Sequence, residues 1–123
     1  MSYDLRIGVK VEGAEDLYAV IDEPDNSSPT YNLGEMFRAC TGWDFVQGNW
    51  YKVSEVLPLI EHGIHELRFN RLAYGKYAPE NGFGSSSGAL KVLESIVECI
   101  QNNTPDSCWT WNHIPLDLMY ISW

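Results

Sequence analysis

The sequence predicts an α+β fold in which a small antiparallel or mixed sheet packs against about three helices. The sheet is expected to use strands from both the N- and the C-terminal part of the chain. Apolar and polar residues alternate near both ends, whereas apolar residues recur every three or four positions between them. No repeat or linker interrupts the 123 residues. Residues 1–123 are therefore expected to form a single α+β domain.

The N-terminal third predicts a strand pair followed by a helix. Residues 3–11 alternate between apolar and polar side chains, which is typical of a strand with one buried face. Residues 17–21 are expected to return as its antiparallel partner. After a polar loop, apolar residues recur at helical spacing in residues 33–41. Asn32 is the expected N-cap of this helix, and Gly42 its expected end.

The middle of the chain predicts a short strand and a second helix. Residues 50–53 are expected to be the strand, and Ser54 is the expected cap of the helix that follows. Pro58 is tolerated only if that helix begins close to it. Gly63 costs about 1 kcal/mol relative to alanine inside a helix, so we expect it to allow close packing of another element. Residues 68–77 are expected to continue as helix or tight turns.

The C-terminal third begins with a loop rich in glycine and serine, residues 79–88, which leads into a third helix. Either Ser86 or Ser87 is the expected cap of this helix. Its expected apolar face is Ala89, Leu93, Ile96, Val97 and Ile100. Strand-like segments are expected at residues 109–111 and 118–123.

Composition restricts the functional classes. The net charge of −9 disfavours a protein that binds nucleic acid directly. The charge is uneven, because residues 1–35 hold eight acids and two bases, whereas residues 62–91 hold four bases and two acids. Cys40 and Cys99 lie on apolar helical faces and are expected in the core. No apolar run of about 18 residues and no signal peptide is evident, so we expect a cytoplasmic protein with no membrane contact.

The glycine- and serine-rich loop is the best candidate for a ligand site. A loop of small residues that enters a helix presents backbone N–H groups to an anion, and basic residues flank it. A phosphate would meet the N–H groups of the serines, while a nucleobase would stack on Phe83 or Trp43, with Asp44 accepting from its amino edge. The alternative is that this loop only provides a helix cap and positive φ angles. The expected ligand-binding residues are Trp43, Asp44, Arg68, Arg71, Asn81, Phe83, Gly84, Ser85, Ser86, Ser87 and Lys91.

Catalytic and metal-binding motifs are weaker. Residues 84–88 fit G-x-S-x-G with Ser86 as nucleophile, but no strand precedes them, and the lysine of a phosphate-binding NTPase loop is missing. His62 and Glu66 have the spacing of a surface ion pair on a helix. We therefore expect no catalytic residue, no metal and no cofactor.

Several motifs resemble a family of small proteins encoded by bacteriophages and prophages, over most of the chain. They are Pro29-Thr30-Tyr31-Asn32-Leu33-Gly34, Met36-Phe37-Arg38, Thr41-Gly42-Trp43-Asp44, Trp50-Tyr51-Lys52, Glu61-His62-Gly63-Ile64 and Asn81-Gly82-Phe83-Gly84. Members of that family more often carry tryptophan at the position of Phe83. The resemblance implies a phage protein in the cytoplasm of a bacterial host cell and an anti-defence, immune-evasion role.

Three functions follow as hypotheses. The first is a non-enzymatic sponge that sequesters a nucleotide-like immune signal, an arrangement compatible with a homo-oligomer that encloses the ligand. The second is an acidic inhibitor that docks on a bacterial defence protein, as an anti-CRISPR does, and imitates nucleic acid with residues such as Asp22, Glu23 and Asp25. The third is a small nucleotide hydrolase.

Overall fold

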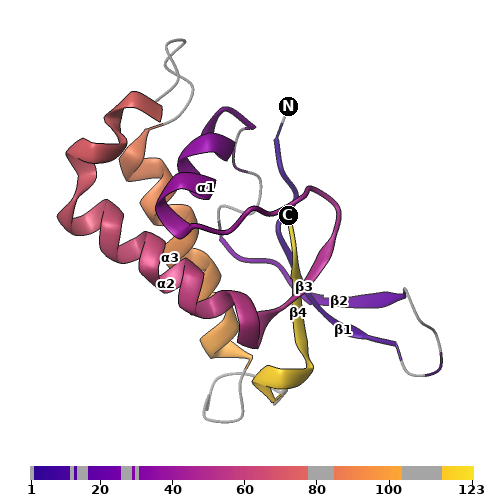
Figure 1. Cartoon of the computed structure of the whole chain (residues 1–123). Coiled ribbons are helices and arrows are strands. Elements are labelled where there is room, and N and C mark those ends of the chain that lie inside the picture. The colour runs from indigo at the N-terminus through magenta and orange to yellow at the C-terminus, as the bar shows by residue number, and fades with distance from the viewer. Residues whose placement is uncertain are drawn as a thin grey trace.

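The computed structural model describes residues 2–11, 13, 17–25, 29, 31–77, 85–103 and 115–123. In this part of the chain, a four-stranded antiparallel sheet has the strand order β2-β1-β4-β3, and three α-helices gather to one side of it (Figure 1). The predicted α+β class is confirmed, and the sheet is antiparallel rather than mixed.

The sheet joins strands that are distant in the sequence. The strands are β1 (Arg6–Lys10), β2 (Tyr18–Asp22), β3 (Trp50–Lys52) and β4 (Met119–Ser122). In the centre, Ile7 of β1 lies opposite Ile121 of β4, which in turn lies opposite Tyr51 of β3. Ile7 and Ile121 are fully buried, so this alternate set of side chains forms the inner face that the helices cover.

The helical segments are η1 (Tyr31–Leu33), α1 (Gly34–Thr41), α2 (Val53–Phe69), η2 (Arg71–Tyr77), α3 (Ser86–Asn102) and η3 (Leu116–Leu118). Gly42 ends α1 as predicted, in the left-handed conformation with φ 71°. The predicted N-caps were wrong. A 3₁₀ turn contains Asn32, so Leu33 precedes α1, and Lys52 rather than Ser54 precedes α2. Because α2 begins at Val53, Pro58 lies inside the helix and removes one backbone hydrogen bond there.

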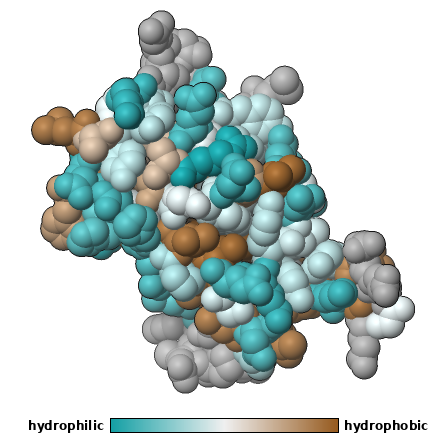
Figure 2. Space-filling view, viewed as in Figure 1, coloured by the Kyte–Doolittle hydropathy of each residue, from teal (hydrophilic) through white to brown (hydrophobic). Residues whose placement is uncertain are grey.

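Gly63 lies where α2 crosses its neighbours, as predicted. An added Cβ would lie 2.6 Å from Cγ2 of Thr41 on α1 and 3.1 Å from Cδ1 of Leu93 on α3. The apolar residues of α2 and α3 supply much of the core between these helices. Hydrophilic side chains cover most of the surface in view, and hydrophobic ones gather in small patches (Figure 2).

A cluster of aromatic side chains fills the core at the C-terminal end of β4. Trp123 stacks on Phe45 with ring centroids 4.3 Å apart, and it also contacts Tyr3, Phe37 and Trp43. The predicted core positions of two cysteines, Cys40 and Cys99, are confirmed, and both thiols are free. The strand predicted at residues 109–111 lies outside the described residues, as does Cys108. Of the helices that the structure describes, none has the length and apolar character needed to cross a membrane.

Candidate functional site

The start of α3 is the described part of the predicted anion site. Ser85, not Ser86 or Ser87, is the N-cap, because its Oγ accepts a hydrogen bond from the N–H of Gly88 at 3.0 Å. The first turn of α3 contains no acidic residue, which leaves the positive end of the helix dipole uncompensated by a side chain. Asn81, Phe83 and Gly84 lie outside the described residues.

Arg71 is the cation that reaches the start of α3. Its Nη1 lies 3.4 Å from Oγ of Ser87, and its Nε donates to the carbonyl of Leu67 at 3.4 Å. Lys91 is exposed one turn further along α3. The structure therefore brings Arg71 together with Ser87 at the start of α3.

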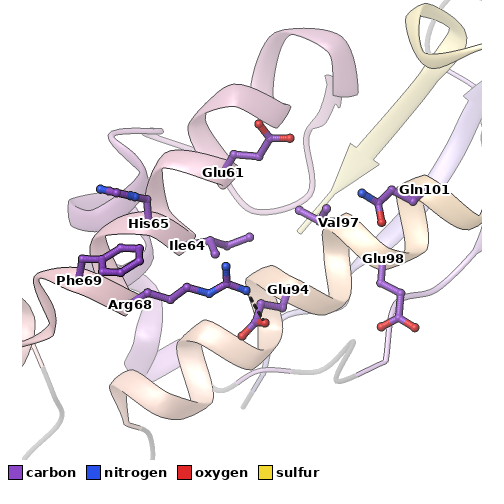
Figure 3. Close-up of a pocket in the computed structure, with 9 residues that line it drawn as sticks. All are labelled: Glu61, Ile64, His65, Arg68, Phe69, Glu94, Val97, Glu98 and Gln101. Atoms are coloured by element: carbon purple, nitrogen blue, oxygen red, sulfur yellow. Dashed lines mark hydrogen bonds and ion pairs between the residues drawn. The ribbon is translucent and has the colours of Figure 1, made fainter.

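Arg68 points elsewhere. Its Nη2 donates to Oε2 of Glu94 at 2.9 Å, across the gap between α2 and α3 (Figure 3). This pairing holds the guanidinium beside Glu94, about two turns into α3, so Arg68 contributes little to an anion at the start of that helix.

Trp43 and Asp44 do not form the predicted stacking site. The side chain of Trp43 is only 6% exposed and packs edge-on against Phe45 and Tyr51, so no ring face is open to a base. The carboxylate of Asp44 is exposed and lies 3.9 Å from Arg38, whose guanidinium covers the ring of Phe45. The loop between α1 and β3 is thus held by core packing, and Trp43 is a core residue.

A hollow of about 350 Å³ lies between α2 and α3, and residues of both helices line it (Figure 3). Ile64 and Val97 face each other in this gap and form its apolar floor. Three glutamates line it (Glu61, Glu94 and Glu98), together with His65, Arg68, Phe69 and Gln101. The side chain of Phe69 is 72% exposed and packs against His65, so the hollow is bordered by a large accessible ring.

A second hollow of about 150 Å³ lies between α3 and the end of β2, and Glu98 lines both. Asp22, Glu23 and Asp25 border it. The amide of Asn103 donates to Oδ2 of Asp22 and to the carbonyl of Cys99, each at 2.8 Å, so the acidic segment is attached to α3. We call the carboxylates around the two hollows, other than Glu94, which pairs with Arg68, the acidic surface: Asp22, Glu23, Asp25, Glu61 and Glu98.

The pKa of the Cys99 thiol depends on its burial and on the charge of this region. Burial raises the pKa of Cys99 to about 12, and the neighbouring Asp22 is the next largest cause, followed by smaller contributions from Asp25 and Glu98. The sequence analysis did not identify the proximity of Glu98 to residues 22–25.

The described part of the chain contains no cluster of metal ligands. Nowhere in it do three or more His, Cys, Asp or Glu side chains gather closely enough to hold a metal ion. The expected proximity of the pair on α2 is confirmed, with Nε2 of His62 lying 3.7 Å from Oε1 of Glu66; the contact is an ion pair when His62 is protonated. A hydrogen bond from Asn70 is the main cause that lowers the pKa of Glu66.

No protein-family model, no curated protein and no solved structure gives a significant match to this chain.

Proposed function

We propose that this protein is a non-enzymatic inhibitor that docks its acidic surface on a basic, nucleic-acid-binding surface of a bacterial defence protein. One observation carries the proposal: Glu98 belongs to both hollows and joins the carboxylates of residues 22–25 to that of Glu61 on α2. Carboxylates on one surface imitate a run of phosphates and attract a cationic partner over a distance of about 10 Å at 0.1 M salt. The net charge of −9 adds to this attraction.

The α2–α3 hollow adds apolar contact surface to the electrostatic attraction. Its apolar floor, Ile64 and Val97, and the exposed ring of Phe69 offer surface that a partner side chain buries on binding. Protein interfaces gain most of their affinity from such buried central contacts, while the surrounding charges set association rate and specificity. The resemblance to phage proteins favours a partner from bacterial immunity.

Phage plating on bacteria that carry a CRISPR system targeting the phage tests this proposal. Cells that express the wild-type protein are expected to restore plaques, and Asp22→Asn combined with Glu23→Gln and Asp25→Asn is expected to reduce the effect. A matched variant, Glu35→Gln with Glu55→Gln and Asp117→Asn, removes the same charge from exposed positions outside both hollows. Equal activity of the two variants would refute a role for the acidic surface.

Sequestration of a nucleotide-like signal is the second candidate, and the contact of Arg71 with Ser87 favours it. A thermal-shift series with linear and cyclic nucleotides tests it, since a ligand at about 100 times its Kd adds about 2.7 kcal/mol of stability. The shift is expected to disappear in Arg71→Ala, and the ligand is expected to be recovered intact after denaturation. A chemically altered ligand would instead indicate the small nucleotide hydrolase.

A further inference from the structure

The side of the sheet that the helices leave uncovered carries aromatic and basic residues. Residues 6, 8 and 10 of β1 point away from the inner face, and paired positions on neighbouring strands share this direction. Lys10 is exposed, and the other large members are half-buried. We call these side chains the outer-face cluster: Arg6, Lys10, Tyr18, Trp50, Lys52 and Tyr120.

Two rings of the outer-face cluster, Tyr18 and Trp50, stack on each other, and we call this stacked pair the platform. Tyr18 and Trp50 are nearly parallel, with centroids 4.9 Å apart and 14° between their planes, and Tyr120 meets Tyr18 edge-on at 5.0 Å. Trp50 packs against β1 at Gly8, where an added Cβ would be 2.9 Å from its Cζ3. The guanidinium of Arg6 lies 5.8 Å from the centre of the Trp50 ring.

A hollow adjoins this platform. It measures about 420 Å³ and is lined by both stacked residues, Tyr18 and Trp50, and by the turn that precedes β3, including Asn49. This volume is within the range of small-molecule sites, and Asn49 brings an amide that donates and accepts hydrogen bonds. A planar heterocycle can therefore stack beside the rings and meet a polar group at its edge.

The charge of this face is opposite to that of the whole protein. Arg6, Lys10 and Lys52 are cations, and none of the outward-facing residues described on the four strands is acidic. Asp22, at the end of β2, accepts a hydrogen bond from Asn103 of α3 and so belongs to the helical side. A net charge of −9 thus coexists with a local group of three cations around stacked rings.

We propose that the outer-face cluster binds single-stranded nucleic acid. Bases stack on the Tyr18–Trp50 platform, while Arg6, Lys10 and Lys52 contact the phosphates. Stacking on aromatic side chains along a cationic face is the usual chemistry by which proteins hold single strands, because every base has a flat face. This binding differs from the expectation, based on the net charge of −9, that the protein does not bind nucleic acid directly. It uses none of the residues of the acidic surface and does not depend on the proposed function.

Fluorescence anisotropy with a labelled single strand of about twelve thymidines tests the proposal. Three phosphate contacts predict a slope of about −2 for log K against log salt, so affinity falls about 18-fold between about 50 and 200 mM salt. Lys52→Gln is expected to weaken binding roughly 5- to 10-fold at about 50 mM salt, and Lys10→Gln likewise. Tyr18→Ser is expected to weaken it roughly 5- to 150-fold.

Lys76→Gln is the matched control, because it removes the same charge from η2, outside the outer-face cluster. It is expected to leave the affinity unchanged, and circular dichroism verifies that every variant is folded. No binding by the wild type at about 50 mM salt would overturn the proposal. Equal losses in Lys52→Gln and Lys76→Gln would also overturn it, as would tighter binding of the corresponding duplex, whose bases are not available for stacking.

Discussion

Replacing Gly63 with alanine tests the packing of the three helices against one another. Inside a helix, alanine is favoured over glycine by about 1 kcal/mol, so the change would stabilise α2 if its surroundings were open. They are closed: the new methyl would lie 2.6 Å from Cγ2 of Thr41, 3.1 Å from Cδ1 of Leu93 and 3.3 Å from Sγ of Cys40. The propensity and packing effects therefore have opposite signs, and the sign of the measured change decides between them.

The packing effect is expected to win. Overfilling a core costs about 1–3 kcal/mol, and here the contacts come from two different helices that cannot both retreat without losing their own packing. Subtracting the gain of about 1 kcal/mol in helix propensity leaves a net loss of up to about 2 kcal/mol. For a domain of this size, the melting temperature is expected to fall by up to about 8 °C.

Urea unfolding followed by circular dichroism measures the change, with Gly88→Ala as the matched control. Gly88 also lies in a helix, but an added Cβ there would be at an ordinary 3.4 Å from Oγ of Ser85, so no loss is expected. Thr41→Ser removes the closest methyl while keeping the hydroxyl that donates to the carbonyl of Phe37. In that background Gly63→Ala is expected to cost less. A Gly63→Ala protein that is about 1 kcal/mol more stable than the wild type would refute the close packing.

Three further predictions concern stability. Ser85→Ala removes the N-cap of α3 and is expected to cost about 1 kcal/mol in urea unfolding, and an unchanged midpoint would contradict this cap. Asn103→Ala removes the amide that donates to the carbonyl of Cys99 and to the carboxylate of Asp22, and it is expected to cost about 1–3 kcal/mol of stability. Unchanged stability would contradict the attachment of Asp22 to α3 through Asn103. Burial raises the pKa of Cys40 to about 11 and that of Cys99 to about 12, from 9.0. Because unfolded thiols lose their protons first, stability is expected to fall between about pH 9 and 11, by up to about 1.4 kcal/mol per pH unit for each thiol, and to fall less in Cys40→Ala.

The architecture was predictable because its signals are local. Alternation at both ends of the chain predicted the sheet, and the spacing of apolar residues predicted the three helices. The N-cap residue of α3 could not be predicted in this way, because three consecutive serines are equally able to accept a backbone hydrogen bond. Which of them becomes the N-cap depends on how the helix turns its buried face, with Ala89 and Leu93, towards the core.

The site residues were harder to predict because they depend on contacts between distant parts of the chain. The local sequence around Trp43 and Asp44 does not indicate whether the tryptophan is exposed or buried. Trp43 is buried because Trp123, from the other end of the chain, packs beside it. The acidic surface needs residue 22 to meet residue 98, and the outer-face cluster needs Trp50 to meet Tyr18. Periodicity indicates which face of an element is polar, but it does not say which polar faces become neighbours.

The two proposed surfaces share no residue, so each can fail without the other. Neutralising Asp22, Glu23 and Asp25 changes the net charge from −9 to −6 and is expected to weaken docking on a basic protein. Because it also reduces the long-range repulsion of phosphates, it is expected to leave single-strand binding unchanged or slightly stronger. Lys52→Gln changes the net charge to −10 and is expected to weaken single-strand binding without affecting inhibition. If both variants instead weakened both activities, one shared surface would be responsible, and the assignment of acidic and basic faces to separate partners would be wrong.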